Sequence, residues 1–333
     1  MTRVAVIDVG TVPARLAIAS VEADHVTNMT RRSTIVNLGE GVDQSGMLLE
    51  SACNRLLACI DDYLLQVRAD QVDALCCTLT SAARDAKNSS QLLDELAARA
   101  LRAQVIPGEV EGKLTFLGVA QDFPTSRLLV ADNGGGSTEF AVGSLEGGRT
   151  PSLDFVRSID VGCRRVTEKY LSRTDPPTSE DLAAAHAFAA EAFGPVLDWE
   201  RKGVSKPERL VVTGGTSTTI VALAKALVPY DSAQVHLATL SQQVVEDQER
   251  RLAGVTAAQR AEFAGIQPKR APVILGGTVA VSEIMRAAGF NEFTVSESDL
   301  LYGLSLTVAA AVEGSASPVG WEPQIGDRPQ VVV

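Results

Sequence analysis

Three segments just after predicted strands combine glycine with hydroxyl side chains, and two of them also contain carboxylates. They read Asp8-Val9-Gly10-Thr11, Asp132-Asn133-Gly134-Gly135-Gly136-Ser137-Thr138-Glu139 and Thr213-Gly214-Gly215-Thr216-Ser217-Thr218-Thr219. Because glycine has no Cβ, several backbone N–H groups can converge on one anion, and neighbouring hydroxyls add further donors. The third segment precedes a predicted helix, whose first amides favour phosphate. One such turn is as common in a bare hairpin, but three of them predict a phosphate-binding site.

Carboxylates beside these turns suggest a metal and a base. Asp8, Asp132 and Glu139 could hold a divalent cation that bridges phosphate oxygens, since Mg²⁺ takes one or two protein carboxylates and keeps several waters. Hydrolysis also requires a base for the attacking water. Glu111 is a candidate, at the start of a predicted helix that follows Ile106-Pro107-Gly108. Taken alone, Glu111 is better explained as a solvated residue at the helix start that the helix dipole stabilises.

The elements that must position these residues alternate between strands and helices. Residues 3–9 form a continuous β-branched run that predicts a buried strand, and apolar positions between Met47 and Arg68 recur at helical spacing. The other elements expected in the first half are strands at 14–20, 25–36, 72–79 and 104–106 and helices at 91–102 and 109–120. This alternation is typical of an α/β fold.

The second half begins as the first does, with a strand (127–132), a glycine turn and a second strand, TEFAVG. Asp132 lies 124 positions after Asp8, and each ends its strand just before the turn, which predicts two related halves. The later elements expected are helices at 163–171, 179–199, 217–227, 239–253 and 256–264 and the strand ERLVVTGG. A break at residues 124–126 predicts domains at 1–123 and 124–313, with the last helix able to pack back on the first domain, and a flexible tail at 314–333.

Composition narrows the class of protein. The 333 residues suffice for two domains, and 45% hydrophobic with 21% charged residues is typical of a globular chain. A net charge of −11 argues against nucleic acid as a partner, because duplex binding depends on many Lys and Arg contacts. No apolar run reaches the roughly 20 residues of a membrane helix, and no signal segment precedes the first strand, so a cytoplasmic location is expected. The five cysteines show no metal-ligand spacing.

Taken together, these motifs resemble the exopolyphosphatase/guanosine pentaphosphate phosphohydrolase (Ppx/GppA) family over about residues 3–310. The matching segments are IDVGTVPARL (7–16), LGEGVDQSG (38–46), TLTSAARDAKN (78–88), VIPGEVEGKLTFLGV (105–119), DNGGGSTEF (132–140), SIDVGCRRVTEKY (158–170) and VVTGGTSTTIVAL (211–223). The resemblance implies a two-domain α/β fold of the actin/sugar-kinase/Hsp70 type (ribonuclease H-like), with an interdomain phosphate cleft.

The resemblance also assigns roles. Glu111 matches the family's catalytic glutamate, and Asp132 and Glu139 match an acidic pair associated with Mg²⁺, with Mn²⁺ as the alternative. Arg84 matches an arginine that contacts phosphate. The phosphate-binding residues implied in this way are Asp8, Gly10, Thr11, Arg84, Gly134, Gly135, Gly136, Ser137, Thr138, Gly214, Gly215 and Thr216.

The first turn departs from the family pattern. It has Val12 and Pro13 where the family usually has polar residues, and Asn37 stands where an arginine is usual. Proline also removes an amide donor. The first domain is therefore expected to offer phosphate fewer ligands and less positive charge.

The implied reaction is Mg²⁺-dependent hydrolytic release of the terminal phosphate from inorganic polyphosphate. Conversion of pppGpp to ppGpp is the alternative within the family, so the partner is polyphosphate or guanosine penta- or tetraphosphate. The residues also leave two other hypotheses open. One is a kinase or ATPase on the same fold, and the other is a phosphate or nucleotide sensor with weakened catalysis. A homodimer is also left open.

Overall fold

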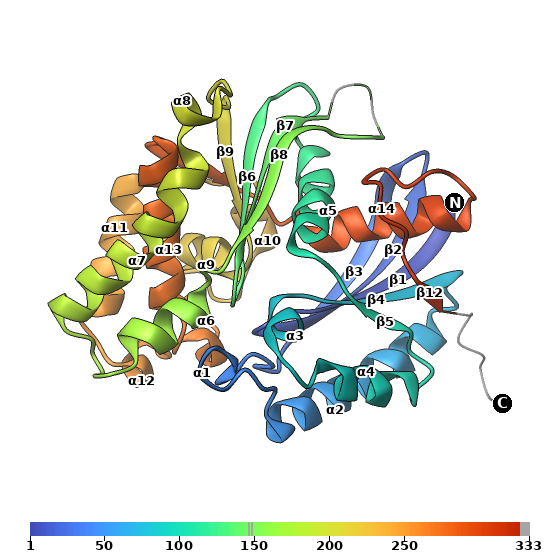
Figure 1. Ribbon diagram of the computed structural model, residues 1–333, viewed down its shortest axis with the longest axis horizontal. Helices are drawn as coiled ribbons and strands as arrows, with labels where there is room; N and C mark the ends of the chain where they lie inside the picture. The colour runs from blue at the N-terminus through green and yellow to red at the C-terminus, as the bar shows by residue number, and fades with distance from the viewer. Residues whose placement is uncertain (146, 148, 327–333) are drawn as a thin grey trace. The chain divides into compact units, whose positions relative to one another are not determined.

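The computed structural model describes residues 1–145, 147 and 149–326, which divide into two compact units (Figure 1). Unit 1 contains Met1–Pro124, Leu145–Ser152 and the C-terminal segment from Leu300. Unit 2 contains Thr125–Ser144 and Leu153–Asp299. Each unit has its own hydrophobic core around a six-stranded mixed sheet. No helix among the described residues is long and apolar enough to span a membrane.

The sheet of unit 1 has its most buried strands at the centre. Its strands are β1 (Thr2–Val9), β2 (Pro13–Glu22), β3 (His25–Ile35), β4 (Ala74–Leu79), β5 (Ala103–Val105) and β12 (Ile325–Gly326). The strand order is β12-β4-β1-β2-β3, and β5 also pairs with β4. All residues of β4 and all but one of β1 are buried, as expected for central strands covered on both faces.

Helices of unit 1 carry two of the predicted site residues. They are α1 (Val42–Ser45), α2 (Glu50–Ala69), α3 (Ser81–Asp85), α4 (Ser89–Ala97), α5 (Gly108–Ala120) and α14 (Leu300–Val312). Arg84 lies on α3 and Glu111 on α5. Helix α14 packs closely on α5, since a Cβ built on Gly303 would lie 1.8 Å from the carbonyl oxygen of Leu114. This close approach fixes the helix that carries Glu111.

The sheet of unit 2 has the strand order β10-β11-β9-β6-β7-β8. Its strands are β6 (Leu128–Asn133), β7 (Thr138–Ser144), β8 (Ser152–Ile159), β9 (Arg209–Thr213), β10 (Thr239–Ser241) and β11 (Glu292–Val295). Its helices are α6 (Cys163–Val166), the π-helix η1 (Thr167–Leu171), α7 (Ser179–Leu197), α8 (Trp199–Lys202), α9 (Gly215–Ala224), α10 (Ser232–Val235), α11 (Gln242–Ala253), α12 (Ala257–Arg260), the 3₁₀ helix η2 (Pro268–Arg270) and α13 (Ile274–Ala288).

The two sheets repeat one topology. In unit 1, β1 pairs antiparallel with β2 and parallel with β4, which in turn pairs parallel with β5. In unit 2, β6 pairs antiparallel with β7 and parallel with β9, which lies between β6 and its other parallel neighbour β11. The repeated order agrees with the two related halves that the sequence predicts.

Several expectations about elements are wrong in part, among them the helix expected at 256–264, which spans only Ala257–Arg260. Residues 314–326 do not form a loose tail, because Val319 is buried and β12 pairs antiparallel with β4; residues 327–333 lie outside the described residues. The helix expected at 239–253 begins only at Gln242, because Ser241 caps it by accepting a hydrogen bond from the Val244 amide, and residues 239–241 form a strand instead.

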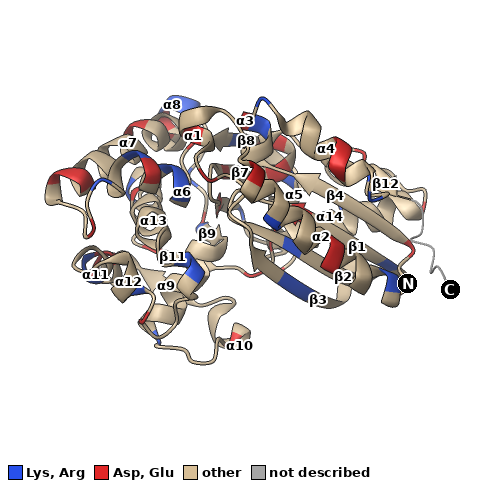
Figure 2. Cartoon of the chain, turned by 90° about the horizontal axis from the view of Figure 1, so that it is seen from below, with Lys and Arg blue, Asp and Glu red and all other residues tan. Residues whose placement is uncertain are grey.

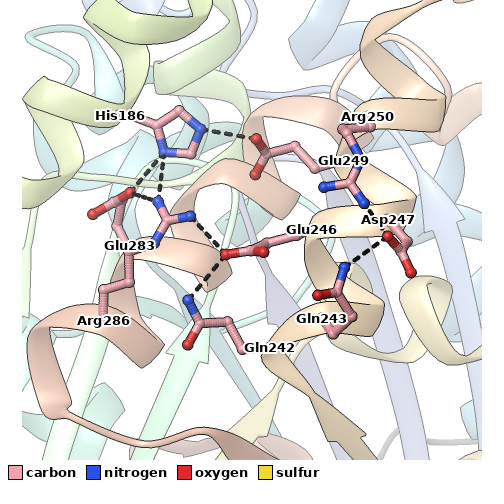
Figure 3. Close-up of polar contacts among 9 residues, drawn as sticks. All are labelled: His186, Gln242, Gln243, Glu246, Asp247, Glu249, Arg250, Glu283 and Arg286. Atoms are coloured by element: carbon pink, nitrogen blue, oxygen red, sulfur yellow. Dashed lines mark hydrogen bonds and ion pairs between the residues drawn. The ribbon is translucent and has the colours of Figure 1, made fainter.

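A partly buried charge cluster joins three helices of unit 2 (Figure 3). His186 of α7 contacts Glu249 of α11 through Nε2 at 2.8 Å and Glu283 of α13 through Nδ1 at 2.7 Å. Arg286 bonds both Glu283 and Glu246. Hydrogen bonds to Glu249 and then to Glu283 raise the pKa of His186 to about 9. Burial would raise the pKa of Glu283, but hydrogen bonds to His186 and Arg286 lower it.

The raised pKa of His186 predicts a pH-dependent stability. Because protonation is favoured in the folded state, the stabilisation is fully present below pH 6.5, the usual His pKa, and is lost as the pH rises through about 9. His186→Gln should therefore lower the melting temperature at pH 6 by about 2–4 °C and have little effect at pH 10. Thermal unfolding across this range tests it, with exposed His25→Gln as control. A difference that persists at pH 10 would contradict the assignment.

Candidate active site

The hairpin β6–β7 brings the two predicted metal ligands together. Asp132 and Glu139 are register partners across the two strands, so both side chains project from the same face of the sheet. They are 7% and 2% exposed. Oε1 of Glu139 accepts hydrogen bonds from the hydroxyls of Ser137 at 2.7 Å and Ser158 at 2.6 Å. Two carboxylates are thus buried side by side at the mouth of the glycine turn.

The glycine turn of this hairpin is held by the segment that begins α6. The Gly134 carbonyl accepts from the Cys163 amide, and the Gly135 carbonyl accepts from the amide of Arg164 at 2.8 Å and, at 3.2 Å, from that of Arg165. The Gly136 carbonyl accepts from Nε of Arg165 at 2.8 Å.

The orientation of these carbonyls exposes the amides to a ligand. A trans peptide directs its C=O and the following N–H to opposite sides, so the amides of Gly135 and Gly136 point away from the α6 segment. Within the described residues, neither of these two amides donates to a protein acceptor. Buried amides without such a partner are suited to an anion. The turn could therefore present these donors to a phosphate, because its carbonyl oxygens are directed toward the α6 segment.

The third glycine turn lies against the second. Gly214 has a φ of +99°, and a Cβ built there would lie 2.8 Å from the Asn133 carbonyl oxygen and 3.1 Å from Oδ1 of Asp132. Glycine is thus required here both by its backbone conformation and by the close approach. The guanidinium of Arg270 lies on Gly215, at the first turn of α9. The sequence motifs did not identify Arg270, which lies in η2, more than fifty residues after the turn it contacts.

Two predicted phosphate-binding hydroxyls make internal contacts. The Thr138 hydroxyl donates to the Val161 carbonyl at 2.5 Å, and its residue is fully buried. Oγ1 of Thr216 lies 2.3 Å from a Cβ built on Gly277, so this side chain faces α13. These two hydroxyls are therefore engaged within unit 2, and only the Thr216 amide lies in the first turn of a helix, where it can serve a phosphate.

In unit 1, Arg84 and Glu111 form an ion pair. Nη1 of Arg84 lies 2.6 Å from Oε2 of Glu111 and also donates to the Ile106 carbonyl at 3.1 Å. Glu111 is 8% exposed, unlike its exposed neighbour Glu109 in the same first helical turn. Because Glu111 is buried, it is not a solvated residue that only stabilises the start of the helix. Its place beside an arginine that could bind phosphate suits a base acting next to a phosphoryl group.

Asp8 pairs with an arginine that the sequence motifs did not single out. Its Oδ2 accepts from Nε of Arg15 at 3.0 Å and from Nη2 at 2.7 Å. Asp8 is 2% exposed, and Arg15 faces it directly across the β1–β2 hairpin. The hairpin register could have identified Arg15 from the sequence, because a tight turn after Gly10 places residue 15 opposite residue 8.

The first turn is closed by its own backbone. The Gly10 amide donates to the Pro13 carbonyl at 3.0 Å, as the Gly134 amide donates to the Ser137 carbonyl at 3.0 Å in the second hairpin. Val12 is buried, and its carbonyl accepts from the Asn37 amide. In place of the polar side chains that are usual in the family, this turn has the buried side chain of Val12 and hydrogen bonds of its own backbone.

The two hairpins carry opposite charges at one equivalent position. Arg15 and Glu139 are 124 positions apart, as are Asp8 and Asp132, and each is the register partner of its aspartate. Unit 1 therefore has an aspartate neutralised by a cation, whereas unit 2 has two carboxylates. Like charges buried this closely repel each other unless a proton or a cation lies between them.

The groups present fit a magnesium ion in unit 2. Mg²⁺ uses one or two carboxylates and retains waters, and the described residues contain no group of three or more His, Cys, Asp or Glu placed for a metal. Asp132 and Glu139 supply two hard oxygen ligands next to a turn that can bind phosphate. Lys and Arg are spread over many elements (Figure 2). A bound phosphate would therefore be neutralised by a few individual side chains.

Comparison with known proteins gives the family. The profile of the Ppx/GppA phosphatase family matches residues 17–308. The chain belongs to the Ppx/GppA phosphatase family. Exopolyphosphatase 2 of Mycobacterium tuberculosis is 35% identical over 325 residues, which cover 93% of this chain and 99% of that protein.

Solved Ppx/GppA structures confirm the predicted fold class. The Aquifex aeolicus family member has a TM-score of 0.77 at 27% identity and covers 93% of this chain and 98% of its own. An exopolyphosphatase from Cytophaga hutchinsonii has a TM-score of 0.83 at 24% identity, covers 96% of this chain and 100% of its own, and supports the fold alone. The two-unit α/β fold of the actin/sugar-kinase/Hsp70 type and the phosphatase assignment, both expected from the motifs, are thus confirmed.

Proposed function

We propose that this chain is a Mg²⁺-dependent exopolyphosphatase, which releases terminal phosphate from inorganic polyphosphate by hydrolysis. The observation that carries the proposal is the glycine turn of unit 2, where the carbonyls of Gly134, Gly135 and Gly136 are turned away and two buried carboxylates lie beside amides that can bind phosphate. The similarity to exopolyphosphatase 2 supports polyphosphate as the substrate.

The residues named in this proposal have separate roles in the chemistry. Glu111 accepts a proton from the attacking water, and Arg84 holds Glu111 and neutralises charge on the phosphoryl oxygens. The amides of Gly135 and Gly136 and the guanidinium of Arg270 stabilise charge that develops on the transferred group. Asp132 and Glu139 would hold Mg²⁺, which when bound supplies positive charge to the phosphate oxygens. No covalent intermediate on the protein is required.

The remaining expectations from the sequence stay predictions. No contact among residues 1–145, 147 and 149–326 favours a guanosine moiety, so pppGpp is a substrate to test beside polyphosphate. Mn²⁺ as an alternative ion, a cytoplasmic location and a homodimer also stay predictions.

Phosphate release measured on polyphosphates of defined length and on pppGpp tests the proposal. Activity on polyphosphate should require Mg²⁺ or Mn²⁺ and disappear with EDTA. Release that continues unchanged in EDTA would contradict the metal assignment. Transfer of phosphate from ATP to an acceptor, with polyphosphate left intact, would contradict hydrolysis. Tight binding of polyphosphate without turnover would instead support the sensor alternative.

A further inference from the structure

A serine outside the set of predicted site residues contacts one of its carboxylates. Ser158 lies near the end of β8, the strand next to β7, and its hydroxyl donates to Oε1 of Glu139 at 2.6 Å. The Ser137 hydroxyl donates to the same oxygen at 2.7 Å. Both distances lie at or close to the range of O–H···O⁻ bonds to a charged carboxylate, about 2.5–2.7 Å, which are stronger than bonds between neutral groups.

The two donors come from different parts of the fold. Ser137 precedes Glu139 by two residues and moves with the same hairpin turn. Ser158 belongs to the neighbouring strand and therefore ties the carboxylate to the body of the sheet. Since both hydroxyls donate to Oε1, they fix the rotation of the carboxylate group and with it the direction of Oε2. A long glutamate side chain would otherwise have several rotamers to adopt.

We propose that Ser158 is a positioning residue that holds Glu139 in the orientation in which Glu139 and Asp132 bind the divalent cation. This inference rests on the proposed function, because it takes the two carboxylates as metal ligands. Ser158 acts through Glu139 and need not contact the substrate. Hydrogen-bond partners of metal-binding carboxylates typically contribute about 10–100-fold to metal affinity or activity.

Mn²⁺ binding to the substrate-free protein, followed by electron paramagnetic resonance, tests the role of Ser158. Ser158→Ala should raise the dissociation constant for Mn²⁺ about tenfold. Ser158→Thr keeps the hydroxyl on a strand residue and should restore binding to within about threefold of the wild type. The Mg²⁺ concentration for half-maximal phosphate release should rise in parallel in Ser158→Ala. Ser152→Ala, at an exposed serine on the same strand, is the matched control and should change neither quantity.

The outcomes separate this inference from the proposed function. If the wild type binds Mn²⁺, Asp132→Asn abolishes binding and Ser158→Ala binds as the wild type does, the positioning role is wrong and the metal site stands. If Ser158→Ala lowers the melting temperature but leaves Mn²⁺ affinity unchanged, the hydroxyl is only structural and the inference is overturned. If the wild type binds no Mn²⁺ and hydrolyses polyphosphate in EDTA, the metal assignment and this inference fail together.

Discussion

Glu111→Gln is expected to lower kcat for phosphate release from polyphosphate about 10³-fold. A general base typically contributes 10²–10⁴-fold, and glutamine cannot accept the proton of the attacking water. The substitution keeps the size of the side chain and an oxygen that can still accept from Arg84, which lies 2.6 Å from Glu111 in the structure. The fold and polyphosphate binding should therefore persist. Steady-state phosphate release gives kcat, and the rise in melting temperature with added polyphosphate reports binding.

Glu109→Gln is the matched control for this prediction. Glu109 lies in the same first turn of α5 and carries the same charge, but its side chain is exposed, whereas Glu111 is 8% exposed. It should change kcat less than twofold, because a surface charge two residues away does not touch the reacting groups. A Glu111→Gln variant that keeps more than a tenth of wild-type turnover would show that another group acts as the base.

Gly162→Ala is expected to reduce kcat/KM about 10²-fold by deforming the glycine turn of unit 2. A Cβ at this position would lie 2.5 Å from the carbonyl carbon and oxygen of Gly135 and 2.7 Å from the Gly136 amide nitrogen. These are backbone atoms, so the turn or the start of α6 must shift. Loss of one donor aimed at a developing negative charge typically costs 10²–10³-fold in rate.

Gly194→Ala provides the contrast in the same unit. Gly194 lies in α7, and a Cβ built there meets no atom within 4 Å. Because alanine favours a helix by about 1 kcal/mol over glycine, this variant should be slightly more stable and fully active. Kinetics of both variants, together with thermal unfolding, separate local damage from loss of fold. Wild-type kinetics for Gly162→Ala would mean that the turn's geometry does not limit the reaction.

The sequence predicted those parts of the site that are contiguous along the chain. The glycine turns and the carboxylates beside them were recognisable because glycine, aspartate and glutamate occur together within a few residues. Burial separated Glu111 from Glu109, which the sequence alone could not do. The resemblance to a known family supplied the role of Glu111, and its geometry in the structure is compatible with that role.

Groups that depend on register or on distant segments could not be predicted in this way. Arg15 becomes a partner of Asp8 only through the pairing of β1 with β2. Ser158 lies on β8, a strand whose side chains are mostly half-buried or exposed, and Arg270 lies far along the chain from Gly215. The C-terminal strand β12 escaped prediction because it is short and follows a segment rich in proline and glycine, while its hydrogen bonds are made with β4.

The difference in charge between Arg15 and Glu139 has a consequence for how such a fold can evolve. A duplicated strand pair starts with two equal copies, and one codon at the position of Arg15 or Glu139 is enough to make them unequal. One copy places Arg15 beside its aspartate, whereas the other places Asp132 and Glu139 together, which is the arrangement that the proposed divalent cation would compensate. Under the proposed function, the charge at this position would decide which copy can take a divalent cation. Specialisation of the halves required no change in backbone topology, which both retain.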